Sequence, residues 1–157
     1  MHSEITKFIL NRGLANVKRY HISPLAHHES VAEHSFYVAL IARTLCDMVE
    51  ETGEKINTLE VLEKALVHDM EEMYSGDILG PVKHSDPEMA KIMDQLGEKS
   101  FELVLKDLPK KQAEHFRYIW LDYHKKLKIE DQIVKISDVL SLIAYCFEQI
   151  NLGNKFM

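Results

Sequence analysis

The sequence predicts an all-α fold, with a single domain of about six helices. Three observations favour this fold. Apolar residues recur at helical spacing along most of the chain, strand-like alternation is scarce, and only six Gly and four Pro interrupt the pattern. At 157 residues, without an internal repeat, a low-complexity segment or a linker, the chain has the size of one domain covering residues 1–157.

Capping motifs and turn residues set the expected bounds of the first three helices. The first is expected over about 3–17, before Pro24 interrupts the chain. Ser30, with Glu33 three residues later, forms a capping box that opens the second helix. The third helix is expected over about 57–76.

Three more helices follow a polar loop over 77–85. Asp86 and Pro87 form an N-cap with proline at the first helical position, which opens the fourth helix. The fifth begins near Pro109, and the last spans about 129–150. The apolar stripes of the second, third and last helices, which we expect to face the core, are Val38, Ile41, Leu45 and Met48, then Leu59, Leu62 and Leu66, then Ile133, Ile136, Leu140, Ile143 and Phe147.

The composition argues against several classes of function. Apolar residues make up 46% and charged residues 28%, as in globular proteins, and the net charge of −6 disfavours a nucleic-acid polymer or an acidic membrane as a partner. No apolar run reaches 18 residues, and the first residues lack the features of a signal peptide. Cys46 and Cys146 form neither a disulfide framework nor a metal-binding pair, so we expect a cytoplasmic protein.

The adjacent residues His68 and Asp69, at the end of an apolar run, are the most informative feature of the chain. Burying two such groups costs desolvation energy unless something binds them. Two more candidate ligands lie on other predicted helices, where His34 shares an apolar stripe and Asp138 faces inward. Glu72 follows Asp69 by three residues, in the same sector of the third helix.

These residues together predict a site for one divalent transition metal ion between helices. Mixed imidazole and carboxylate ligands suit Co, Mn, Zn, Ni or Fe better than Ca or Mg. Taken singly, His34 could be a structural hydrogen-bonding residue and Asp138 could satisfy backbone groups. Taken together, inward-facing ionisable residues without a shared partner would be costly. Because such an ion activates water and neutralises phosphoryl oxygens, the pattern indicates a hydrolytic site.

Three segments of the chain resemble one known family. They read SVAEHSFYVALIA at 30–42, ALVHDMEEMYSGDILGPVK at 65–83 and KISDVLSLIAYCFEQINLGNKF at 135–156. These motifs resemble those of the HD-domain metal-dependent phosphohydrolases, and in particular the branch that contains bacterial 5′-deoxynucleotidases. The resemblance runs from Arg19 to the C-terminus and implies an all-helical fold.

The resemblance also implies a role for each residue of the metal site. It implies that His34, His68, Asp69 and Asp138 are ligands of one metal ion. It implies that Glu72 is the catalytic acid/base.

Four further residues are assigned to the substrate by the same resemblance. Arg19, Asp77 and Lys83 would hold the nucleotide, although each could otherwise be a solvated or turn residue. A guanidinium such as that of Arg19 binds phosphate bidentately, keeps its charge and can also absorb charge during catalysis. Tyr20 stands where the family often has a tryptophan against the sugar, which weakens the expectation of strict deoxyribose selection.

The expected reaction is hydrolysis of deoxynucleoside 5′-monophosphates to a deoxynucleoside and phosphate. An alternative is a triphosphohydrolase that releases triphosphate from dATP, because the short chain resembles compact phage-type members, which would act in the host cytoplasm. Ile22 and Pro81 could then shape a purine pocket, or could simply be packing and loop residues. A third possibility is a non-catalytic interaction domain with a structural metal, against which Glu72 argues. We also expect a homo-oligomer.

Overall fold

The computed structural model describes residues 2–83, 85–125 and 127–155. Within these ranges the chain forms eight α-helices and one 3-10 turn, with no β-strand beyond a single bridge, which confirms the all-α prediction. The elements are α1 (His2–Leu10), η1 (Gly13–Ala15), α2 (Val31–Glu50), α3 (Thr58–Val67), α4 (Glu72–Ser75), α5 (Gly80–Lys83), α6 (Pro87–Leu105), α7 (Lys110–Lys125) and α8 (Ile129–Asn151). Among the described helices, none combines the length and apolar character that crossing a bilayer requires.

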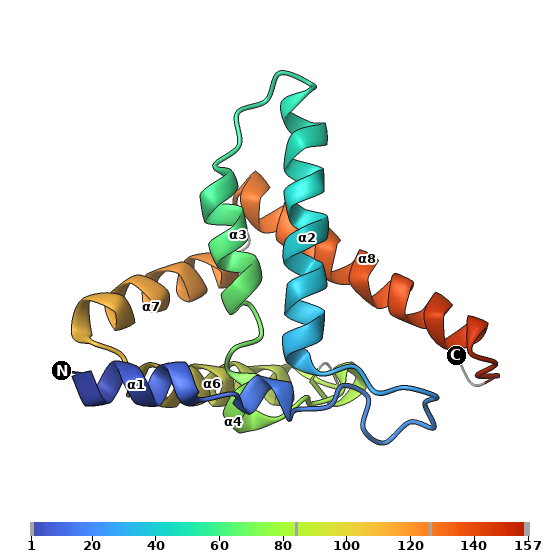
Figure 1. Cartoon of the computed structure of the whole chain (residues 1–157), viewed down its shortest axis with the longest axis horizontal. Helices are drawn as coiled ribbons and strands as arrows, with labels where there is room; N and C mark the ends of the chain where they lie inside the picture. The colour runs from blue at the N-terminus through green and yellow to red at the C-terminus, as the bar shows by residue number, and fades with distance from the viewer. Residues whose placement is uncertain (1, 84, 126, 156–157) are drawn as a thin grey trace.

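The helix α2 is the centre of the arrangement (Figure 1). It packs against α3 on one side and against α8, which crosses it obliquely, on the other. Buried residues of these helices and of α7 form one core cluster: Val38, Ala42, Cys46, Val61, Ala65, Tyr123, Ile133 and Val134. A second cluster joins the end of α3 to α6 and α7: Val67, Phe101, Leu105, Ala113, Ile119 and Trp120.

Two of the predicted caps are present as expected. The Ser30 hydroxyl accepts a hydrogen bond from the Glu33 amide at 3.2 Å, and the Glu33 carboxylate accepts one from the Ser30 amide at 2.7 Å. The Asp86 carboxylate accepts a hydrogen bond from the Met89 amide at 2.9 Å, with Pro87 in the first turn of α6. These caps satisfy amides that a helix leaves unpaired at its start.

Two predicted helices are shorter than expected. The first ends at Leu10 instead of near 17, because the Asn11 side chain accepts a hydrogen bond from the Gly13 amide and so competes with helix continuation. The predicted helix over 57–76 breaks after Val67, where hydrogen bonds tighten to three-residue spacing, as in the bond from the Glu72 amide to the Asp69 carbonyl. The HD pair therefore lies in a turn between α3 and α4.

Many of the apolar residues predicted to face the core are exposed, so that part of the prediction is wrong. Met48 on α2 is 58% exposed, and on α3 Leu59 is 67% and Leu66 is 56% exposed. Ile133 is buried as predicted, but Ile136, Leu140, Ile143 and Phe147 of the same stripe are exposed. The α8 sector that packs inward instead carries Ser137, Ser141, Tyr145 and Gln149. Ser141 on this sector contacts His34 of α2.

Candidate active site

Three separate elements bring the four predicted metal ligands together. His34 comes from the second turn of α2, His68 and Asp69 from the turn after α3, and Asp138 from α8. His34 Nε2 lies 3.2 Å from Asp138 Oδ1 and 3.8 Å from Asp69 Oδ2. His68 Nε2 lies 3.2 Å from the same oxygen of Asp69. One ligand atom each from His34, His68 and Asp69 lies within 4.8 Å of the others.

The protonation pattern of His68 fits a cation at this point. Its Nδ1 lies 2.8 Å from the Ala65 carbonyl and donates a hydrogen bond to it, so in the neutral ring Nε2 carries a lone pair. That Nε2 is buried, has no hydrogen-bond partner among the described residues, and faces the Asp69 carboxylate. Two lone pairs at this distance need a positive charge between them. Burial opposes a charge on His68, but Asp69 outweighs it and raises the pKa of His68 to about 9, so the carboxylate favours a positive charge between the two groups, which is a proton when no metal ion is bound.

His34 is oriented in the same way. Its Nδ1 lies 3.2 Å from the Ser141 hydroxyl, and the tautomer that donates to this oxygen directs the Nε2 lone pair at Asp69 and Asp138. Burial lowers the pKa of His34, which favours the neutral ring that a metal ligand requires. Burial opposes ionisation of Asp138, but the nearby His34 imidazole and Lys135 ammonium outweigh it and hold the pKa of Asp138 well below its usual range. The donor set therefore fits a divalent metal ion.

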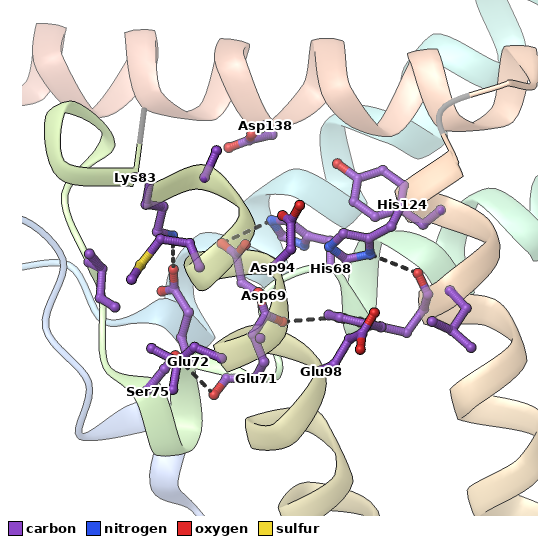
Figure 2. Close-up of a pocket in the computed structure, with 18 of the residues that line it drawn as sticks. His68, Asp69, Glu71, Glu72, Ser75, Lys83, Asp94, Glu98, His124 and Asp138 are labelled. Atoms are coloured by element: carbon purple, nitrogen blue, oxygen red, sulfur yellow. Dashed lines mark hydrogen bonds and ion pairs between the residues drawn. The ribbon is translucent and has the colours of Figure 1, made fainter. Parts of the chain in front are cut away.

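Glu72 begins α4, one turn beyond Asp69, and is only 4% exposed. Its Oε1 accepts a hydrogen bond from Lys83 Nζ at 2.9 Å (Figure 2). Burial and the charge of Asp69 raise the pKa of Glu72 to about 8, while Lys83 acts in the opposite direction. A carboxyl group with this pKa can both take up and release a proton near neutral pH.

Arg19 and Tyr20 lie where the chain doubles back before α2. The Arg19 amide donates to the Glu29 carbonyl at 2.9 Å, and the buried guanidinium donates from NH1 to Glu29 Oε2 at 3.2 Å. Burial opposes the charge, but Tyr20 and Asp69 raise the pKa of Arg19, so it stays a cation. Tyr20 adopts a φ of 52°, and its amide donates to Asp77 Oδ2 at 2.7 Å. The Asp77 carboxylate thus holds the turn that carries Arg19.

A cavity of 470 Å³ opens beside the ligand cluster. Figure 2 shows Glu72 and Lys83 on one side of it and His68 and His124 on the other, with Asp138 above. The α6 and α7 wall contributes Met93, Asp94, Leu96, Gly97, Glu98, Trp120, Leu121, Tyr123 and His124.

Several predicted substrate residues do not lie in this cavity. Its described lining does not include Arg19, Tyr20 or Asp77, which lie together as described above. Ile22 is 69% exposed and Pro81 is also exposed, and neither lines the cavity. A purine pocket shaped by Ile22 and Pro81 stays a prediction.

Two carboxylates of the site were not predicted from the sequence. Glu71 lines the cavity and accepts a hydrogen bond from Trp120 Nε1 at 3.0 Å. Burial raises the pKa of Glu71 to about 7. No role was predicted for Glu29, the partner of Arg19. The capping box that starts at the next residue marks the beginning of a helix, but nothing in the sequence indicates that Glu29 pairs with Arg19.

The comparisons with known proteins agree with this geometry. The family model described as 5′-deoxynucleotidase YfbR-like matches residues 8–157. The chain belongs to this family. A 5′-deoxynucleotidase of Vibrio vulnificus is 31% identical over 139 residues, covering 88% of this chain and 71% of the relative. A 5′-deoxynucleotidase of Yersinia pestis is 27% identical, with 88% and 70% covered.

Solved structures of similar fold support the same conclusion. An HD-domain phosphohydrolase from Listeria innocua superposes with a TM-score of 0.82 at 28% identity, covering 98% of this chain and 72% of that one. A Pyrococcus horikoshii protein superposes with a TM-score of 0.77 at 28% identity, covering 99% and 82%. The resemblance inferred from the sequence motifs is confirmed.

Proposed function

We propose that the protein hydrolyses deoxynucleoside 5′-monophosphates to a deoxynucleoside and phosphate. The observation that carries this proposal is the buried His68 Nε2, which faces Asp69 without a hydrogen-bond partner among the described residues, next to the Glu72–Lys83 pair. The relatives named above are 5′-deoxynucleotidases, which supports the substrate class and argues against a non-catalytic interaction domain.

One divalent transition metal ion is proposed as the cofactor, with His34, His68, Asp69 and Asp138 as its ligands. Two imidazoles and two carboxylates favour Co, Mn, Zn, Ni or Fe over Ca or Mg. When bound, the ion would activate water and neutralise negative charge on the phosphate.

Glu72 is proposed as the acid/base of the reaction. Its carboxylate takes the proton from the attacking water and returns it to the leaving oxygen of the sugar. The Lys83 ammonium, 2.9 Å from Glu72 Oε1, holds this carboxylate in place and lies close enough to share its charge with a bound phosphate.

Arg19, Tyr20 and Asp77 are proposed to bind the nucleotide. The Arg19 guanidinium has five N–H donors, and its contact with Glu29 uses NH1, which leaves donors for a phosphate. Tyr20 and Asp77, joined through the Tyr20 amide, would contact the sugar. The alternative, release of triphosphate from dATP, gains no support from the exposed positions of Ile22 and Pro81.

The decisive experiment is an activity assay against a nucleotide panel. The metal-free protein is loaded with Co²⁺ or Mn²⁺ and incubated with deoxynucleoside and ribonucleoside monophosphates and with deoxynucleoside triphosphates. We expect inorganic phosphate from the deoxynucleoside monophosphates, loss of activity on chelation, and recovery on adding metal. Triphosphate release from dATP, without monophosphate hydrolysis, would replace the proposal by the alternative.

We further propose that two copies of the chain associate through α8. Its exposed apolar residues follow a heptad spacing of four and three: Ile136, Leu140, Ile143, Phe147 and Ile150. Such a seam is typical of a helix that packs against another helix, and a two-fold axis would pair it with itself. A light-scattering mass of a dimer or larger is expected, with Ile143→Glu shifting it towards the monomer. A monomer mass for the unaltered protein at micromolar concentration would refute this proposal.

We also infer that the chain is one domain and is located in the cytoplasm. The two core clusters share α3 and α7, so neither is separate from the other. Neither Cys46 nor Cys146 forms a disulfide within the part of the chain that the structure describes, which fits a reducing compartment. Limited proteolysis that leaves two stable fragments would contradict the single domain.

A further inference from the structure

Glu29 is a buried carboxylate that the proposed reaction leaves without a role. It immediately precedes Ser30, the N-cap of α2, and is 5% exposed. A β-bridge between Lys18 and Ser30 places Glu29 across from Arg19, and the Arg19 amide donates to the Glu29 carbonyl. The side chains meet as well, with Arg19 NH1 donating to Glu29 Oε2 at 3.2 Å.

The same carboxylate oxygen also faces the metal site. Glu29 Oε2 lies 3.8 Å from His34 Nδ1, on the side of the ring away from the Nε2 that faces Asp69 and Asp138. Ser141 Oγ lies 3.2 Å from this Nδ1 and can accept a hydrogen bond from it. A negative charge behind a ligand imidazole orients the ring and makes the other nitrogen a stronger ligand.

Burying a carboxylate is costly unless charged or polar partners compensate it. Arg19 supplies that compensation, so Glu29 could be an ion pair that only stabilises the fold. Such a pair would require no contact with His34, yet a single oxygen of Glu29 lies 3.2 Å from Arg19 NH1 and 3.8 Å from His34 Nδ1. Glu29 is therefore placed to affect both the cation that binds phosphate and a ligand of the metal.

We propose that Glu29 is a positioning residue that holds the Arg19 guanidinium and the His34 imidazole at once, tying the phosphate-binding group to the metal centre. This inference rests on the proposed function, because only there do Arg19 and His34 bind phosphate and metal. It predicts two separable effects of changing Glu29, one on metal affinity through His34 and one on substrate affinity through Arg19.

The test compares Glu29→Ala and Glu29→Gln with Glu33→Gln in the full-length protein. Glu33 lies in the first turn of α2, and its carboxylate binds Ser30, a cap that glutamine can keep. Three quantities are measured: the Co²⁺ or Mn²⁺ affinity by calorimetry, the kcat and KM on a deoxynucleoside monophosphate, and the thermal midpoint.

For Glu29→Ala we expect a loss of about 10-fold or more in metal affinity, the size of effect seen when a group that orients a ligand is removed. We also expect KM to rise about 10-fold, as for one lost charge-assisted hydrogen bond, with a smaller change in kcat. For Glu29→Gln, both metal affinity and KM should lie between those of Glu29→Ala and the unaltered protein, because glutamine keeps the shape and the acceptor for Arg19 but not the charge. Glu33→Gln should leave metal affinity and KM unchanged.

A double-variant cycle separates the two contacts. In the Arg19→Ala background, Glu29→Ala should add little to KM, because Glu29 acts on substrate through Arg19, while the loss of metal affinity should persist. Unchanged metal affinity and KM in a folded Glu29→Ala, with only a lower thermal midpoint, would overturn the proposal. If Glu29→Ala does not fold, unchanged metal affinity and KM in a folded Glu29→Gln would overturn the proposal instead. A protein that binds metal but hydrolyses no nucleotide would refute the proposed function, while the metal-affinity comparison would still test Glu29.

Discussion

Glu72 and its neighbours show how burial gives single residues their chemistry. The Glu72 carboxylate is buried beside Asp69, and both burial and the neighbouring charge favour its protonated form. Lys83 opposes this with a hydrogen bond of 2.9 Å, so the group stays able to ionise. The acid/base role proposed for Glu72 needs this balance, whereas the ligand role proposed for Asp138 needs a carboxylate that stays ionised, as the lowered pKa of Asp138 allows.

The first prediction concerns Glu72→Ala. Turnover should fall about 10²–10⁴-fold, because the proton-transfer group is lost. Metal content and nucleotide binding should stay close to those of the unaltered protein, because four other residues are the proposed ligands. Steady-state kinetics and elemental analysis measure both, with the exposed Glu114→Ala on α7 as the control. Turnover near that of the unaltered protein would refute the acid/base role, and loss of the metal would make Glu72 a ligand.

The sequence could indicate the ligand cluster because its members share a physical problem. His34 and the HD pair are ionisable groups at inward-facing positions, and one bound cation would compensate the desolvation cost of burying them. Glu29 and Glu71 could not be found in this way. In sequence they look like any solvated glutamate, and only the β-bridge near Arg19 and the Trp120 indole give them partners.

At the scale of elements, a buried ion network joins α3, α7 and α8. Lys64 has no exposed surface, although it carries a charge. Its ammonium donates to Glu60 at 2.8 Å, to Asp122 at 2.9 Å and also to Asp131. Lys128 adds a second cation at Glu60 and Asp122. The network ties Glu60 and Lys64 of α3 to Asp122 of α7 and Asp131 of α8.

The second prediction is that Lys64→Met destabilises the protein by about 3–5 kcal/mol, as when one partner of a buried ion pair is removed. Methionine keeps the apolar stem but leaves Asp122 and Asp131 without their shared cation. Urea unfolding measures the free energy, with the exposed Lys91→Met on α6 as the matched control. Equal stability of the two variants would show that the network contributes little.

The third prediction concerns the pH dependence that Asp122 gives to stability. Hydrogen bonds from Lys128 and Lys64 lower the pKa of Asp122 from 3.8 to about 2. A group whose pKa is lower in the folded state stabilises the fold above its unfolded pKa, and this contribution disappears as pH falls through the folded pKa. The stability difference between the unaltered protein and Asp122→Asn should therefore be constant above about pH 4 and shrink between about pH 4 and 2. A difference that stays the same over that window would contradict the assignment.

Two elements show where sequence patterns stop determining structure. The sequence predicted the helix α8 correctly but not its buried sector, which carries Ser137, Ser141 and Gln149 rather than most of the large apolar residues. Gln149 is fully buried because its side chain binds the backbone of Ala26 and His27, a long-range contact with no sequence signal. The break after α3 is similarly a local tightening that helical periodicity cannot reveal.

At the scale of the whole molecule, the proposed ion would be a cross-link between elements far apart in the sequence. Its ligands come from α2, from the turn between α3 and α4, and from α8. Without a cation, the buried His68 Nε2 and the carboxylate of Asp69 face each other directly. The ion should therefore stabilise the fold as well as serve catalysis, because it binds the folded chain and not the unfolded one.

The last prediction follows from that linkage. Removing the metal should lower the thermal midpoint, and adding Co²⁺ or Mn²⁺ at about 100 times its Kd should restore about 2.7 kcal/mol of stability. His68→Ala should lose this response because a ligand is gone, whereas His115→Ala, whose exposed imidazole binds only Glu63 among the described residues by a hydrogen bond, should keep it. Differential scanning calorimetry of both variants, with and without metal, gives the comparison. An identical metal response in both variants would mean that the ion binds elsewhere. A thermal midpoint of the unaltered protein that does not change with metal would mean that the helices pack together without the ion. Protons on the histidines would then compensate the burial of the carboxylates.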